Sequence, residues 1–333
     1  METPQTFLST DVVHHLLPGA GAGAAAAAVL DRFDVVIVQH EFGVYGGADG
    51  DEILGVLDDL RRPVIVVLHT VLTSPTAHQR HVLERVVHRA DAVVTMTGTA
   101  RNRLLVGYRV DAAKVEVIPH GAAAPATFSR PRPAGPPVIL TWGLLGPGKG
   151  IESAIDALAE LRSLDPPPRY RVVGQTHPRV LDRDGESYRR ALMARAAARD
   201  VAHLVTFHPA YLDSAALSTA VAEADIVVLP YESRQQVSSG VLIEAVAAGK
   251  PVVATAFPHA VELLADGAGL VVPHGDSVAL AAALRRLLTE PALRASMTNR
   301  GARVVPQLLW PAVSARYQRL ARHLVAASVG IGA

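Results

Sequence analysis

The chain contains no cysteine among its 333 residues. Disulfide bonds, thiolate zinc sites and cysteine nucleophiles are therefore excluded together. Because a protein without disulfides fits a reducing compartment, we expect a cytoplasmic location.

The chain also lacks a charge excess and a long apolar run. Its 32 basic residues are balanced by 31 acidic ones, and no basic block could neutralise a run of phosphates, so we expect no nucleic-acid partner. The most apolar early stretch, Gly19 to Leu30, is too short to cross a bilayer and lacks the basic residues that precede a signal core. We expect no transmembrane segment, while peripheral membrane contact and oligomeric state stay open.

Short runs of valine and isoleucine alternate with longer stretches rich in alanine, leucine and arginine from Phe33 onward. The short runs are typical of buried parallel strands, and the longer stretches are typical of amphipathic helices. The expected strands are Val35–Gln39, Val64–Leu68, Ala92–Met96, Val115–Ile118, Val138–Trp142, Arg171–Val173, Val205–Phe207, Ile226–Leu229, Val252–Thr255 and Leu270–Val272. The expected helices are Asp51–Leu60, Gln79–Arg89 and residues 151–163, 186–199, 214–223, 240–248, 258–265 and 277–288.

This alternation predicts an α/β fold of two Rossmann-like, doubly wound parallel-sheet lobes that face a central cleft, because the chain is too long for one core. The proline-rich, unpatterned stretch Ala122–Pro137 is a connector, which gives a first lobe at residues 1–130 and a second at 136–310. The helical stretch Ala292–Ala326 is too long for a cap alone, so we expect residues 311–333 to cross back to the first lobe. Ligands of such sheets bind beyond the carboxyl ends of the strands.

The most informative segment is YESRQQVSSGVLIEAVAAGKPVVAT, which begins at Tyr231 and leads from a strand through a polar loop into a helix. Ser238, Ser239 and Gly240 stand at the start of that helix. Unpaired backbone N–H groups and the positive end of the helix dipole are found at such a position. The helix start therefore suits a diphosphate or a sugar.

Glu244 interrupts the apolar residues of the same helix, so its charge needs a partner. One interpretation is that this carboxylate only complements the helix dipole. The other uses the four-residue spacing of Gln236, Gly240 and Glu244, which places them on one side if the helix begins early. A carboxylate there can accept two hydrogen bonds from a ribose diol.

A second cluster, WGLLGPGKGIE, follows one strand and precedes a helix, with closely spaced glycines from Gly143 onward. Lys149 emerges at the helix start, where an ammonium group suits the developing charge of a departing nucleoside diphosphate. The alternative is a solvated lysine in a turn. The cluster is neither a Walker phosphate loop nor a GxGxxG motif.

In the first half, QHEFGVYGG places His40 and Glu41 directly after a strand, and Gly43 belongs to a flexible loop. LHTVLTSP places His69 and Thr70 at the tip of the next strand. One histidine at a strand end is often structural, but two at neighbouring tips favour a shared site. None of the 14 histidines lies in an HxxxH helix pattern or beside a thiol, so we expect no metal site.

Together these segments resemble glycosyltransferase family 4, whose members are retaining enzymes of the GT-B fold, and the resemblance covers nearly the whole chain. It rests on SSGVLIEAVAAGKPVVAT, similar to the family's signature helix and strand, and on GLLGPGKGIESAIDAL, similar to its lysine loop. The resemblance implies that Glu244 binds the donor ribose, Lys149 contacts the diphosphate and His69 approaches the transferred sugar. It also implies that no metal or cofactor is required, and that the phosphate contacts come from the backbone of Ser239, Gly240 and Val241.

The chain departs from the family pattern in three places. Gln236 stands where the first of two glutamates is usual, and Leu144 replaces an arginine beside the lysine loop. The unpatterned segment Met1–Leu17 replaces the usual first strand and glycine-rich loop, so the first lobe looks shortened. The elements QHEFG, HTVL, GPGKG, THP and QxSSG match a subgroup of the family, and His177 of THP and Tyr231 join the cleft candidates.

The function expected from the sequence is transfer of a hexose from a nucleoside-diphosphate sugar to a hydroxyl acceptor with retention, and GDP-mannose is the donor that the resemblance favours. The candidate catalytic residues are His69, Lys149 and Gln236. One rival is a non-catalytic protein that binds a nucleotide sugar or a glycan. Another keeps the two lobes but catalyses epimerisation or phosphorolysis.

Overall fold

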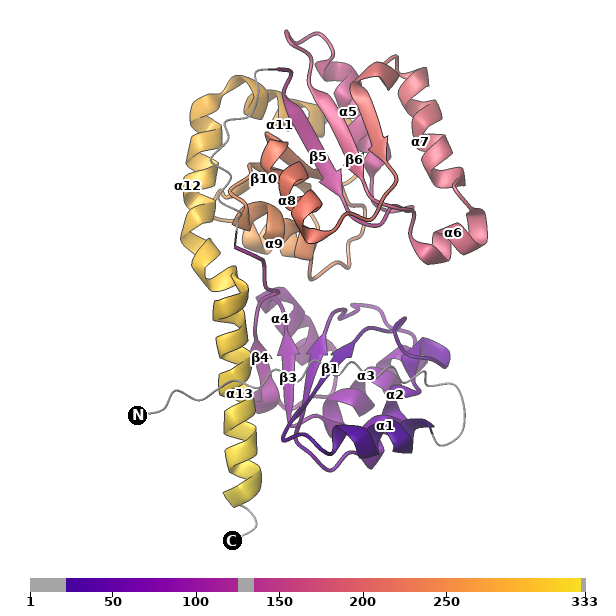
Figure 1. The fold of residues 1–333 in the computed structure, drawn as a ribbon, viewed down its shortest axis with the longest axis vertical. Coiled ribbons are helices and arrows are strands. Elements are labelled where there is room, and N and C mark those ends of the chain that lie inside the picture. The colour runs from indigo at the N-terminus through magenta and orange to yellow at the C-terminus, as the bar shows by residue number, and fades with distance from the viewer. Residues whose placement is uncertain (1–21, 125–134, 331–333) are drawn as a thin grey trace.

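The computed structural model describes residues 22–124 and 135–330. Two α/β lobes are stacked along the long axis, and the helices at the end of the chain run beside both lobes (Figure 1). The segment Met1–Leu17 lies outside the described residues, as does the middle of the Ala122–Pro137 connector.

The first lobe is built on a four-stranded parallel sheet with the strand order β1-β2-β3-β4. All five residues of β2 are buried, because this run of apolar side chains is covered on both faces. Helices α1 to α4 cover one of these faces and share a single apolar core with the strands. The elements are α1 (Ala22–Leu30), β1 (Val36–His40), η1 (Ala48–Gly50), α2 (Ile53–Asp59), β2 (Val64–Leu68), α3 (Ala77–Arg89), β3 (Ala92–Thr95), α4 (Gly98–Gly107), η2 (Ala112–Lys114) and β4 (Val115–Val117).

The opposite face of the first sheet is covered by the last helix, α13 (Trp310–Gly330). Val313 of α13 packs in one core with Ile65 of β2, and the guanidinium of Arg316 donates to the carbonyl of Val117. The end of the chain therefore crosses back to the first lobe, where it lies beside β4 (Figure 1). Among the described residues the first sheet shows no reversal of strand order, so its second face depends on α13 rather than on crossover helices.

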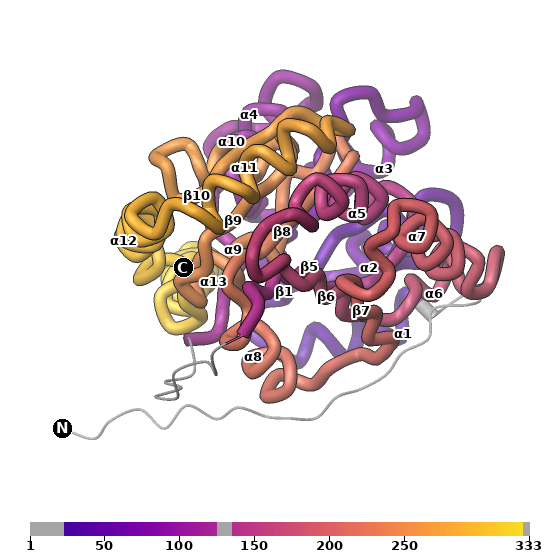
Figure 2. The backbone as a smooth tube through the Cα atoms, turned by 90° about the horizontal axis from the view of Figure 1, so that it is seen from above, coloured from indigo at the N-terminus to yellow at the C-terminus, as the bar shows by residue number. Residues whose placement is uncertain are grey.

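The second lobe is a doubly wound parallel sheet with the strand order β10-β9-β8-β5-β6-β7. Seen along the long axis, α5, α7 and α11 lie on one side of the strands, and α8 and α9 lie on the other (Figure 2). The elements are β5 (Val138–Trp142), α5 (Ile151–Leu161), β6 (Arg169–Val173), α6 (Pro178–Asp184), α7 (Ser187–Ala198), η3 (Ala202–Leu204), β7 (Val205–His208), α8 (Ser214–Glu223), β8 (Ile226–Leu229), α9 (Gly240–Ala247), β9 (Val252–Thr255), α10 (Pro258–Leu263), β10 (Gly269–Val272), α11 (Ser277–Thr289) and α12 (Pro291–Leu308).

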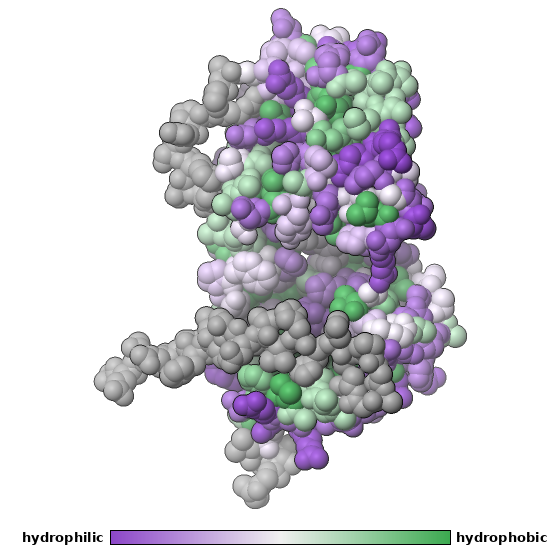
Figure 3. Space-filling model, turned by 45° about the vertical axis from the view of Figure 1, so that its right-hand side comes forward, coloured by the Kyte–Doolittle hydropathy of each residue, from purple (hydrophilic) through white to green (hydrophobic). Residues whose placement is uncertain are grey.

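The reversal of strand order between β5 and β8 places a crevice at the carboxyl ends of these strands. The loops after β5 and β8 meet the loops after β1 and β2 between the lobes. The surface is indented at this level in the space-filling view (Figure 3). The fold therefore brings the polar loops of both lobes to one place.

The structure confirms the two predicted parallel-sheet lobes, and every expected strand is present within two residues of its expected ends. The helix expected at Asp51–Leu60 begins later, at Ile53, because residues 48–50 form a separate turn with Asp49 at φ 53°. Three helices were not predicted. α1 consists mostly of alanine and has no polar face, while α4 and α6 mix charged and apolar residues without a clear period.

The turn before α5 depends on Gly150, which has φ +66° and lies against the Pro230 carbonyl. An added Cβ would be 1.7 Å from that oxygen. Gly150→Ala should therefore displace the Lys149 loop and lower the free energy of unfolding by at least about 3 kcal/mol. Gly55→Ala in α2 is the matched control, since no atom lies within 4 Å of its added Cβ, and it should stabilise by up to about 1 kcal/mol. Equal denaturation midpoints for the two variants would contradict this account.

Candidate functional site

A cavity of about 500 Å³ lies between the lobes. Its walls are loops that follow β1, β2 and β4 in the first lobe and β5 and β8 in the second, together with the start of α9. The predicted site residues on these walls are Glu41, His69, Thr70, Lys149, Tyr231, Gln236, Ser238, Ser239, Gly240 and Val241. The unpredicted ones are His120, Ser233, Gln235 and Val237.

Helix α9 begins at the cavity and is capped by Ser239, whose hydroxyl accepts the N–H of Leu242 at 3.2 Å. The backbone N–H of Ser239 donates to Nδ1 of His259 at 2.8 Å. This N–H therefore already has a partner within the protein. The N–H groups of Gly240 and Val241 have none among the described residues, and they remain available to an anion.

His120 stands over the start of α9, and the sequence reasoning missed it. A Cβ on Gly240 would lie 3.1 Å from Cε1 of this imidazole, so glycine permits the close approach. Nδ1 of His120 lies 2.7 Å from the carbonyl oxygen of Gly121. The sequence does contain an indication of its role, because His120 follows directly after an expected strand and a proline.

The ammonium group of Lys149 lies 4.5 Å from the centroid of the Tyr231 ring. Burial lowers the pKa of Lys149, and no carboxylate of the described residues counters this shift. Tyr231 is itself fully buried, and its phenol is hydrogen-bonded to the Ser239 side chain. Burial raises the pKa of this phenol. A cation that has no anionic partner among the described residues therefore faces the cavity.

Glu244 lies one turn beyond Gly240 and is half-buried, and it does not line the cavity wall. Its Oε2 accepts the indole N–H of Trp142 at 3.3 Å, which supplies the partner that its charge needs. Gln236 precedes the helix, and its backbone carbonyl accepts the N–H of His259 at 3.3 Å. The expectation that Gln236 shares a helix side with Gly240 and Glu244 is wrong, because α9 begins only at Gly240.

The first-lobe wall is held by hydrogen bonds among its own polar groups. The Thr70 hydroxyl donates to the Glu41 carboxylate at 2.5 Å, and Nε2 of His69 lies 2.7 Å from the Gln39 amide oxygen. Burial lowers the pKa of His69, and Glu41 opposes this shift. A neutral His69 that donates from Nε2 keeps Nδ1 as an acceptor.

Besides Glu244, four predicted site residues lie away from the cavity wall. His40 is completely buried, and neither ring nitrogen has a hydrogen-bond partner among the described residues. His177 caps α6 by accepting the N–H of Arg179 at 3.2 Å. The carbonyl of Gly43 accepts the Arg179 guanidinium at 2.5 Å, and Gly143 donates its N–H to a β6 carbonyl at 3.0 Å.

The loop between β8 and α9 also joins the lobes. The Gln235 amide oxygen accepts the hydroxyl of Thr73 at 3.0 Å, and the Thr97 hydroxyl donates to the carbonyl of Val237 at 2.9 Å. Beside this loop, both carboxylate oxygens of Glu262 accept backbone N–H groups at the start of α4, each at 2.8 Å. Because Gln235 and Val237 line the cavity, these bonds fix the cavity wall to the first lobe.

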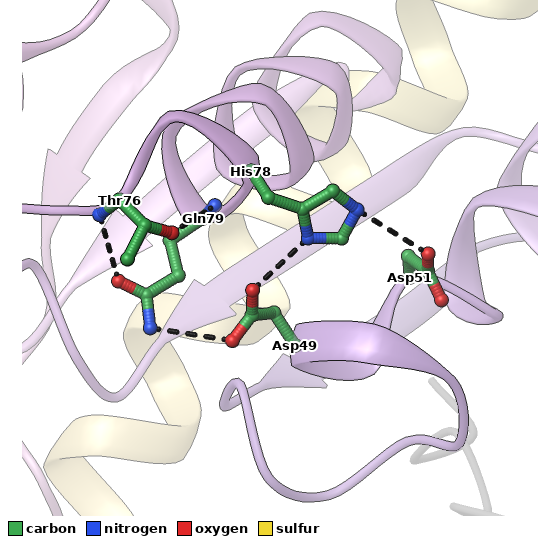
Figure 4. Close-up of polar contacts among 5 residues, drawn as sticks. All are labelled: Asp49, Asp51, Thr76, His78 and Gln79. Atoms are coloured by element: carbon green, nitrogen blue, oxygen red, sulfur yellow. Dashed lines mark hydrogen bonds and ion pairs between the residues drawn. The ribbon is translucent and has the colours of Figure 1, made fainter.

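The glycine-rich loop after β1 is fastened to α3 by the polar cluster in Figure 4. Thr76 and Gln79 form a capping box, and the Gln79 amide donates to Asp49 at 3.2 Å. The ring nitrogens of His78 lie 3.0 Å from Asp49 and 3.5 Å from Asp51. These contacts anchor the far end of the loop that carries Glu41.

Among residues 22–124 and 135–330, no group of three or more histidine, aspartate or glutamate side chains could hold a metal ion. Within the same ranges, every helix is too short or too polar to cross a membrane.

Two family models match the chain. Residues 126–304 match a model described as glycosyl transferases group 1, and residues 8–123 match one described as glycosyltransferase family 4. The D-inositol 3-phosphate glycosyltransferase of Kineococcus radiotolerans is 33% identical over 252 residues, which cover 69% of this chain and 57% of the relative. The phosphatidyl-myo-inositol mannosyltransferase of Mycolicibacterium smegmatis is 28% identical and covers 78% of this chain and 64% of its own. The chain thus spans less than two thirds of each of these relatives.

Solved structures show the same fold at low sequence identity. Sucrose-phosphate synthase from Thermosynechococcus elongatus has a TM-score of 0.73 and 22% identity, covering 92% of this chain and 78% of its own. HepE of Anabaena, solved in complex with UDP and glucose, has a TM-score of 0.71 and 22% identity. The match covers 92% of this chain and 82% of HepE.

Two buried histidines should make the fold sensitive to acid. Burial lowers the pKa of His40 and of His259 to about 4, whereas histidine in an unfolded chain has a pKa of about 6.5. The unfolded chain therefore binds these protons first, so the free energy of unfolding falls as the pH drops from about 6.5 towards 4. His40→Leu should remove up to about half of this loss, because one of the two most strongly shifted histidines is gone.

Denaturant unfolding at pH values between about 7 and 4 measures this effect. The exposed His81 of α3 provides the control, and His81→Leu should leave the acid sensitivity unchanged. The assignment fails if His40→Leu loses stability with acid as steeply as the unchanged chain.

Proposed function

Because the chain belongs to the glycosyl transferases group 1 family, we propose that it moves a hexose from a nucleoside-diphosphate sugar to a hydroxyl acceptor with retention at the anomeric carbon. The observation that carries the proposal is the position of Lys149 on one cavity wall with the N–H groups of Gly240 and Val241. These groups are electropositive and have no anionic partner among the described residues. A diphosphate supplies the missing negative charge.

The chemistry of the step follows from this placement. As the bond from the sugar to the diphosphate breaks, negative charge develops on the leaving group. Lys149 and the start of α9 stabilise that charge in a partly buried site, where such interactions are strong. In this proposal the departing diphosphate takes the proton of the attacking hydroxyl on the same face of the sugar, and neither a metal nor a further cofactor takes part.

The ribose of the donor is assigned to Glu244. Its Oε2 accepts the Trp142 indole N–H at 3.3 Å, which orients the carboxylate. The carboxylate keeps acceptor capacity for a hydroxyl pair, because each oxygen has two lone pairs. A ribose bound there would lie next to the diphosphate, because Glu244 is one turn beyond Gly240 on the same helix.

The sugar and the acceptor are assigned to the opposite wall, which His69, Glu41 and Thr70 form. A neutral His69 with Nδ1 as acceptor can receive a hydrogen bond from a hydroxyl without placing a positive charge beside the sugar. Gln236 adds an uncharged amide to the same cavity.

GDP-mannose is the donor that we favour, and one matched relative is named as a mannosyltransferase. Incubation with UDP-, GDP- and ADP-sugars, followed by measurement of nucleoside-diphosphate release with and without acceptors, tests the function and identifies the donor. Binding without release would support a non-catalytic nucleotide-sugar-binding protein instead. Conversion of the free sugar nucleotide into its epimer would support the epimerase alternative.

Lys149→Ala should lower kcat by at least about tenfold and by up to about a thousandfold, because one stabiliser of the leaving-group charge is lost. Lys114→Ala is a matched control, since that ammonium donates to the Ala90 carbonyl far from the cavity walls, and it should keep full activity. Steady-state rates of nucleoside-diphosphate release measure both variants. A folded Lys149→Ala protein with normal turnover would refute the role of Lys149.

Glu244→Ala should weaken nucleoside-diphosphate binding by about tenfold or more, since hydrogen bonds to a charged group contribute about 1.5–3 kcal/mol. Glu244→Gln keeps an oxygen for the Trp142 indole and should fold as stably as the unchanged chain, yet bind the nucleotide less tightly. Calorimetric titration gives the dissociation constants. Equal affinity in all three proteins would remove the ribose assignment.

A further inference from the structure

A second cavity, of about 430 Å³, lies between the first sheet and α13. Its walls are the α13-facing side of β1 and β2, the end of β3, the segment after β4 and the first turns of α13. None of the lining residues that the structure describes is aspartate, glutamate, lysine or arginine. The apolar residues on its walls are Ile37, Val67, Met96, Pro119, Trp310 and Val313.

Two large apolar side chains in this apolar cavity remain open to solvent. Ile37 is 45% exposed and Trp310 is 48% exposed. Trp310 is fixed in this place, because its ring packs against the backbone of Gly121, where an added Cβ would lie 2.2 Å from it. Its ring also lies 5.6 Å from that of His120. The wall is therefore preformed, and an apolar ligand would remove this surface from water.

The apolar cavity adjoins the candidate site. His69 and His120 line both cavities, so these two side chains form the boundary between them. Gln39, at the rim of the apolar cavity, holds His69 through a contact of 2.7 Å. A molecule that places a hydroxyl beside His69 can therefore extend past this boundary into apolar surroundings.

We propose that the acceptor is an amphiphile, with its reacting hydroxyl beside His69 and an uncharged alkyl chain in the apolar cavity. This inference rests on the proposed function for the place of the reaction. The described part of the cavity wall carries no charged residue, and this favours an uncharged chain, because a charged group buried there would lack a partner among these residues. The rim residues Ser314 and Gln318 of α13 can contact the polar part of a longer acceptor.

Ethyl, butyl, hexyl and octyl β-glucosides, used below their micelle concentrations, test the proposal in the full chain saturated with nucleoside diphosphate. Calorimetry should show affinity rising by up to about fourfold for each buried methylene. In Ile37→Gln this rise should flatten, because a polar side chain now stands in the cavity wall. Val106→Gln is the matched control, since Val106 is 90% exposed on α4 and lines neither cavity.

An affinity that is independent of chain length in the unchanged protein would overturn the proposal, and so would the same rise in Ile37→Gln and in the unchanged protein. The transfer assay separates this failure from failure of the proposed function. If the affinity rises with alkyl-chain length but no donor supports transfer, the apolar site is supported and the transferase activity is contradicted. Transfer to the glucosides with an affinity that does not depend on alkyl-chain length would support the transferase activity and remove the apolar site.

Discussion

The fold holds a lysine ammonium and a helix N-terminus on the same cavity wall, and none of the described residues supplies an anion between them. Burial lowers the pKa of Lys149, and the first N–H groups of α9, which have no partner among the described residues, present further positive charge on the same wall. The ring of Tyr231, 4.5 Å from the ammonium, offsets part of the lost hydration. A diphosphate, as in the proposed function, would replace the favourable interactions with water that burial takes from these positive groups.

This arrangement requires close approaches that only particular residues allow. Gly150 lets the lysine loop pass against the Pro230 carbonyl, and Gly240 lets the His120 ring lie over the helix start. Ser239 ends the extended segment and caps the helix, and His259 accepts a hydrogen bond from the Ser239 N–H. The segment before α9 is also hydrogen-bonded to the first lobe through Gln235 and Val237. The same residues therefore hold the start of α9 in place and fix the distance between the first-lobe and second-lobe walls of the cavity.

The sequence was sufficient for the strands and for the approximate position of the site, because buried parallel strands are continuous apolar runs and their carboxyl ends carry the polar loops. It was not sufficient for contacts between distant segments. The bond from Ser239 to His259 joins residues 20 apart, and no local pattern indicates it. The alignment of Gln236 with Gly240 and Glu244 required an early start of the helix, whereas the helix begins where the Ser239 hydroxyl caps it. His40 and His69 look alike in sequence, yet burial in the sheet separates a packing residue from a cavity residue.

The apolar cavity follows from how the first sheet obtains its second layer. Four strands spaced about 4.8 Å apart place their outer strands about 14 Å apart, whereas a helix with its side chains is about 10–12 Å wide. One helix therefore cannot cover the whole face. α13 packs on β2, β3 and the segment after β4, where Ile65, Val94 and Ile118 are fully buried. The strand left uncovered is β1, whose Ile37 stays half-exposed. Because β1 ends at the loop that carries Glu41, this uncovered strip leads directly to the candidate site.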